Sequence, residues 1–64
     1  MINEGDKVKL LTEEIAVISE VLEINVAYIA EVFKRDGGIS IEQISQKEIV
    51  SVFKETEHPI AATI

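Results

Sequence analysis

The sequence predicts an all-β protein whose five short strands close into a small barrel. Three observations support this: eight β-branched residues among the twenty from 15 to 34, segments in which polar and apolar residues alternate, and an Asp36-Gly37 pair. Several short strands with one small turn before the last are typical of such a barrel. We expect the strands near residues 6–11, 15–23, 27–35, 38–44 and 49–55.

The first three strands are predicted from their patterns. Lys7-Val8-Lys9-Leu10 alternates between polar and apolar residues, which is typical of a half-buried strand. Residues 16–22 and 27–34 are apolar runs of ordinary strand length.

The second half of the chain begins with the predicted hairpin at Asp36-Gly37, because Gly adopts positive φ at no cost and Asp tolerates it. Alternation resumes over residues 39–42 and places Ile39 and Ile41 on the same face. Residues 45–48 are polar and predict one helical turn, and residues 49–53 return as the last strand.

The alternative fold is an α-helical dimer or coiled coil over residues 13–35. A heptad seam supports it, formed by Ile15, Ile18, Leu22, Ile29 and Val32. Eight of the twenty residues from 15 to 34 are β-branched, however. Each β-branched residue costs a helix roughly 0.5 kcal/mol relative to alanine, so the eight together disfavour the helix by about 4 kcal/mol. Apolar residues also lie off the seam, so we favour strands.

Composition limits the function classes. The 64 residues predict one domain, residues 1–55, followed by a tail over residues 56–64. A net charge of −6 opposes binding to a phosphate backbone. The chain has no Cys, no apolar run long enough for a membrane span and no signal-peptide pattern, so we expect a cytoplasmic protein. We predict no cofactor and no small-molecule substrate.

The order and spacing of the strand patterns resemble the small bacterial SH3-like barrels of unknown function. The resemblance covers residues 4–54 and rests on the segments GDKVKL (5–10), AVISEVL (16–22), AYIAEV (27–32), DG (36–37) and KEIVSV (47–52). It implies the fold and an interaction module without a shared catalytic site. The loop of residues 11–15 lacks the glycine that often precedes the second strand in ribosomal and transcription-factor relatives, which weakens a nucleic-acid function.

The residues with metal-ligand chemistry cluster at Glu55, Glu57 and His58. In an extended segment the two carboxylates point one way and the imidazole the other, so they do not converge on one ion. We therefore predict no metal site and no catalytic site, and we expect that the protein is not an enzyme.

The predicted functional surface is apolar and lies around the turn between the second and third strands. Ile24 and Val26 are poor turn residues, and the third strand has apolar residues on both faces. We favour an interface with a second copy or another protein, formed by Ile24, Val26, Tyr28 and Ile29. The alternative is a bulge that shifts the alternation of a curved strand.

The competing function is that of a nucleic-acid accessory domain. If the first strand lies near the hairpin tip, one small basic patch forms from Lys7, Lys9, Lys34 and Arg35. Four cations on an acidic protein bind a phosphate backbone weakly, in a manner that salt abolishes.

Overall fold

The computed structural model describes residues 1–53, which form five antiparallel strands and one short 3-10 helix. The elements are β1 (Lys7–Leu10), β2 (Ile15–Glu23), β3 (Ala27–Phe33), β4 (Ile39–Ser45), η1 (Gln46–Glu48) and β5 (Ile49–Phe53). The all-β prediction is confirmed. The alternative of a helical dimer over residues 13–35 is wrong, because β2 and β3 occupy that segment.

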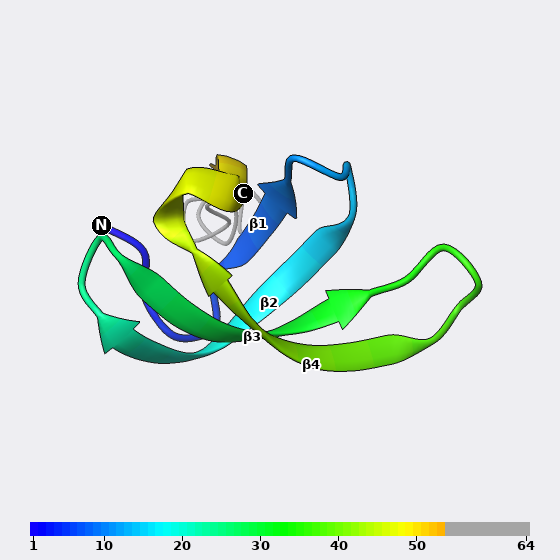
Figure 1. Ribbon diagram of the computed structural model, residues 1–64, viewed down its shortest axis with the longest axis horizontal. Helices are drawn as coiled ribbons and strands as arrows, with labels where there is room; N and C mark the ends of the chain where they lie inside the picture. The colour runs from blue at the N-terminus through cyan, green and yellow to red at the C-terminus, as the bar shows by residue number, and fades with distance from the viewer. Residues whose placement is uncertain (54–64) are drawn as a thin grey trace, which may run out of the picture.

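The strands form one strongly bent sheet in the order β4-β3-β2-β1-β5 (Figure 1). Each neighbouring pair is antiparallel. Within residues 1–53, β4 and β5 are the edges of the sheet and are not paired with each other, so the closed barrel that we predicted is not formed. The η1 turn links these two edges, and Leu11 N donates a hydrogen bond to Glu48 O at 2.8 Å.

The strand bounds agree with the sequence analysis to within one or two residues. β2 is where we predicted it, β1 is one residue shorter at each end, and β3 ends at Phe33 instead of residue 35. β4 begins and ends one residue later than predicted. The last strand begins at Ile49 as predicted, whereas its predicted end, the domain boundary at residue 55 and the tail lie outside the described residues.

The core lies on the inner face of the bent sheet. In β3, Tyr28, Ala30 and Val32 are buried, whereas the alternate residues are half-buried or exposed. This is the two-residue period of a strand with one face against the core. The remaining buried apolar residues are Ile2, Val8, Leu10, Ala16, Ile18 and Ile44. Ile2 precedes the first strand, so the core includes a residue that strand patterns do not identify.

Strand β2 bends because it contains two irregularities. Its register against β3 shifts between Ile18 and Glu20 and again between Val21 and Glu23. The hydroxyl of Ser19, the extra residue of the first shift, donates a hydrogen bond to Ile29 O at 3.1 Å. Bulges increase local twist and disrupt alternation. The bulge alternative of the sequence analysis concerned the third strand, whereas the two bulges lie in β2 and burial alternates regularly along β3.

Two hairpins share one turn geometry. At the β3–β4 turn, Gly37 N donates to Lys34 O at 3.0 Å, Lys34 N donates to Gly38 O at 2.7 Å, and Gly37 has φ +95°. This is a three-residue loop with a glycine bulge. The predicted hairpin is confirmed, but Gly37 alone has positive φ, and Asp36 instead accepts a hydrogen bond from Gly38 N at 2.8 Å.

The β1–β2 turn repeats this geometry with a glutamate in the glycine position. Glu13 N donates to Leu10 O at 2.7 Å, Leu10 N donates to Glu14 O at 2.9 Å, and Glu13 has φ +76°. A side chain with a Cβ is strained in this left-handed region. Glu13 thus occupies in the β1–β2 turn the position that Gly37 occupies in the β3–β4 turn.

We expect Glu13→Gly to stabilise the fold. Removing the Cβ relieves left-handed strain of about 1 to 2 kcal/mol, and the larger entropy of glycine in the unfolded chain offsets part of it. The net gain should be about 0.5 to 1 kcal/mol in urea unfolding. Glu13→Ala is the control, because it removes the same charge but keeps the Cβ. An equal gain in both variants would show that charge, and not backbone strain, is responsible.

Candidate interaction surface

The turn between β2 and β3 presents apolar side chains to solvent. Val26 N donates to Glu23 O at 2.9 Å, and Asn25 takes the left-handed conformation with φ +64°. Asn tolerates this position of a β-turn, so the two β-branched neighbours avoid positive φ. Ile24 and Val26 remain 58% and 47% exposed, and Leu22 beside them is 45% exposed. We call Leu22, Ile24 and Val26 the apolar tip.

The other two residues of the predicted interface lie on opposite faces of β3. Tyr28 is fully buried, and its hydroxyl donates a hydrogen bond to Gln46 Oε1. Ile29 is half-buried on the outer face, next to Gln43 of β4. The structure therefore brings Ile24 and Val26 together at the tip but places Tyr28 in the core, where it cannot contact a partner.

A second group of exposed apolar residues lies on the outer face of β3 and β4. Phe33 is directly opposite Ile39 in the ladder, and Ile41 is two residues further along β4. All three side chains are exposed. Sequence alternation correctly paired Ile39 with Ile41 but gave no indication that they face outward. Ile44 lies three positions after Ile41, so in a regular strand it is on the opposite face, and this is the face that is buried.

The four cations of the predicted basic patch are divided between two sides of the sheet. Lys7 and Lys9 alternate with buried residues of β1 and therefore lie on its outer face. Lys34 lies on the inner side, between two carboxylates. Arg35 Nη2 donates to Thr12 O at 3.5 Å. The structure therefore does not gather the four cations into the single patch that the sequence predicted.

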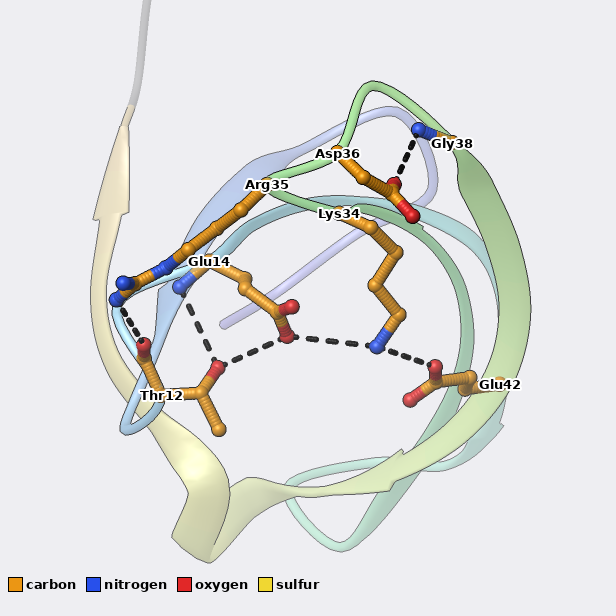
Figure 2. A network of polar contacts seen from close by, with 7 residues as sticks. All are labelled: Thr12, Glu14, Lys34, Arg35, Asp36, Gly38 and Glu42. Carbon is orange, nitrogen blue, oxygen red and sulfur yellow. Dashed lines mark hydrogen bonds and ion pairs between the residues drawn. The ribbon is translucent and has the colours of Figure 1, made fainter.

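Lys34 is the centre of a polar network at the end of the molecule where the β1–β2 and β3–β4 turns meet (Figure 2). Its Nζ lies 2.9 Å from Glu42 Oε2 and 3.5 Å from Glu14 Oε1. The Thr12 hydroxyl donates to the same Glu14 oxygen at 3.0 Å and accepts from Glu14 N at 3.3 Å. In Figure 2 these side chains converge within the curve of the ribbon. The network joins the β1–β2 turn to the β3–β4 hairpin.

The ion pair keeps its charges at neutral pH. The hydrogen bond to Glu42 raises the pKa of Lys34, and the carboxylate of Glu14 raises it further. The same hydrogen bond from Lys34 lowers the pKa of Glu42, with a smaller contribution from Ser40. The shifts move both pKa values away from neutrality, so neither group is poised to exchange a proton near pH 7. The arrangement suits a structural link better than acid–base catalysis.

Within residues 1–53, no three His, Cys, Asp or Glu side chains are grouped so that they could hold a metal ion. Glu55, Glu57 and His58 lie outside that range. In the described part of the chain, no helix has the length and apolar character that crossing a membrane requires.

The fold and surface together define a small all-β protein with an open antiparallel sheet and exposed apolar residues at the β2–β3 tip and on β4. Comparisons with protein-family models, curated proteins and solved structures give no match to this chain.

Proposed function

We propose that the protein is a non-enzymatic interaction module with an SH3-like arrangement of strands, which self-associates or docks on a protein partner. The fold part of the proposal is supported by the strand order, with β1 between β2 and β5, and by the short η1 turn before the last strand. Both agree with the resemblance found in the sequence. The functional part rests on exposed apolar surface.

The observation that carries the functional proposal is the exposure of the apolar tip. Three apolar side chains at alternate positions, Leu22, Ile24 and Val26, are each more than two-fifths exposed. Scattered single apolar residues are ordinary on a protein surface, whereas a group with polar surroundings marks an interaction site. Glu23 and Asn25 alternate with these residues and supply that polar rim. Such a surface suits an apolar groove on another protein.

The tip is tested by size-exclusion chromatography with light scattering, at several concentrations and at low and high salt. We expect a species larger than the monomer that high salt does not dissociate, because apolar contacts are not screened. Replacing the tip with Ile24→Ser and Val26→Ser should weaken this association by about tenfold or more.

The matched control is Lys7→Ser with Lys9→Ser, which alters the outer face of β1 and leaves the tip intact. Association that is unchanged in the tip variant would contradict the role of the tip. Association that high salt abolishes and that the lysine control also loses would instead show that charged contacts, and not the tip, hold the copies together.

A further inference from the structure

Strand β4 is an open edge of the sheet. Within the described residues, β3 is the only strand beside it. All seven residues of β4 pair with β3 without a register shift. Its sequence, ISIEQIS, contains no Lys or Pro, and it has no bulge. Lys residues, Pro residues and bulges are the features with which natural proteins commonly prevent an edge strand from pairing with another chain.

Hydrogen bonds at both ends of the β3–β4 ladder identify the backbone groups that face the open edge. Lys34 N donates to Gly38 O at 2.7 Å, and Gln46 N donates to Val26 O at 2.8 Å. Hydrogen-bonded and non-hydrogen-bonded pairs alternate in an antiparallel ladder, so every second residue of β4 bonds to β3. Those residues are Ser40, Glu42 and Ile44. The residues of β4 that turn their N–H and C=O groups outward are Ile39, Ile41, Gln43 and Ser45, and the first three are centred on Ile41.

The same part of β4 is apolar on the outer face. Ile39 and Ile41 are 62% and 72% exposed, and Phe33 lies beside Ile39. We propose that this edge pairs in an antiparallel manner with β4 of a second copy, so that one sheet continues through both molecules. Ile41 then lies opposite its own counterpart at the two-fold axis.

The position of Glu42 is compatible with this register and disfavours the neighbouring one. With Ile41 on the axis, Ile39 pairs with Gln43 of the other copy, and the outward groups form about six backbone hydrogen bonds. Ser40 then lies opposite Glu42 of the other copy, so that a small polar side chain and not a second carboxylate faces Glu42. Moving the axis to Glu42 would place two like charges directly opposite each other, which is destabilising.

Net charge does not prevent this pairing. The chain carries a charge of −6, so two copies repel each other except where their acidic groups are distant or neutralised. Glu42, the only charged residue of β4, is paired with Lys34 at 2.9 Å. Glu31 lies beside Ile41 on β3. The two Glu31 residues would be three strand spacings apart, about 14 Å, which exceeds the Debye length of about 8 Å at physiological salt.

The experiment combines sedimentation equilibrium with amide hydrogen exchange by NMR, both on the full chain over a range of concentrations. We expect a monomer–dimer equilibrium in which the amides of Ile39, Ile41 and Gln43 become protected as the dimer forms. In the fully dimeric sample their exchange should slow by about tenfold or more. The amides of Ser40, Glu42 and Ile44 are internal controls, because β3 protects them in the monomer as well.

The mutational test is Ile41→Lys, which places a charge on each copy at the axis. Because Ile41 is exposed, this change should preserve the fold while weakening dimerisation by about tenfold or more. The matched control is Val50→Lys on the opposite edge strand, where the exposed side chain is of similar size and dimerisation should be unchanged. Gln43→Pro removes one outward N–H group and should also weaken the dimer.

Three results would overturn the proposal. The first is a monomer at millimolar concentration in which the three outward amides exchange freely. The second is a monomer in which they are protected, which would mean that the edge is covered within the same molecule. The third is a dimer that Ile41→Lys leaves intact but that the tip substitutions at Ile24 and Val26 abolish. This last result would support the role of the tip. A dimer that only Ile41→Lys dissociates would instead support pairing through the β4 edge and contradict self-association through the tip.

Discussion

Replacing Tyr28 with alanine is expected to unfold the protein. The side chain is fully buried in the middle strand of the β2-β3-β4 segment, opposite Val21 on one side and Ile44 on the other. Truncating a buried aromatic residue to alanine typically costs about 3 to 5 kcal/mol. The total stability of a small domain is commonly only about 5 kcal/mol or a little more, so most or all of it would be lost.

The control Tyr28→Phe separates packing from hydrogen bonding. It keeps the ring and removes only the hydroxyl that donates to Gln46 Oε1. Because Gln46 is half-buried, its oxygen can find water, and the expected cost is about 1 kcal/mol. Urea unfolding followed by circular dichroism measures both variants. A stable, cooperatively folded Tyr28→Ala protein would contradict the central position of the ring.

The hydroxyl of Tyr28 also has a local role at η1. Its partner Gln46 is the first residue of that turn, and Gln46 N donates to Val26 O at 2.8 Å. The side-chain and backbone hydrogen bonds together attach η1 to the start of β3. The sequence marked residues 45–48 as a polar turn, but it could not show that Tyr28, eighteen residues earlier, holds the turn in place.

Local patterns predicted the strands well because each depends on residues close together in the chain. The alternation of β3 was visible in the sequence, with Tyr28 and Ala30 on one face and Ile29 and Phe33 on the other. Which face is buried was not visible, because both are apolar. That choice depends on long-range pairing and curvature, and Tyr28 was consequently assigned to an interface when it belongs to the core.

The closure of the sheet into a barrel and the positions of the charged side chains were harder to predict, because both also depend on long-range pairing and curvature. Whether five strands close depends on the bends at Ser19 and Leu22 in β2, and an irregular register of this kind leaves no clear mark in an apolar sequence. The basic patch was inferred from residue type alone. Lys34 instead lies between Glu42, on the next strand of the same hairpin, and Glu14, which is distant in the chain and approaches it only through the fold.

The second large effect is expected on β4, where two isoleucines three positions apart have opposite environments. Ile44 is 2% exposed and lies opposite Tyr28, whereas Ile41 is 72% exposed on the outer face. Ile44→Ala should therefore lower the free energy of unfolding by about 2 to 5 kcal/mol, since it opens a cavity in the core. Ile41→Ala removes the same atoms from solvent-exposed positions and should change monomer stability by no more than about 0.5 kcal/mol.

The pair also tests the assignment of faces on β4 independently of any partner. Urea unfolding should be measured at micromolar or lower concentration, so that dimerisation through Ile41 does not contribute to the measured stability. If Ile44→Ala and Ile41→Ala lowered the free energy of unfolding equally, the register of β4 would be wrong. In a double-mutant cycle, Tyr28→Phe and Ile44→Ala should be coupled because the two side chains are cross-strand neighbours, whereas Tyr28→Phe and Ile41→Ala should be additive. This contrast would place Ile44 in the core and leave Ile41 free to act as a contact residue.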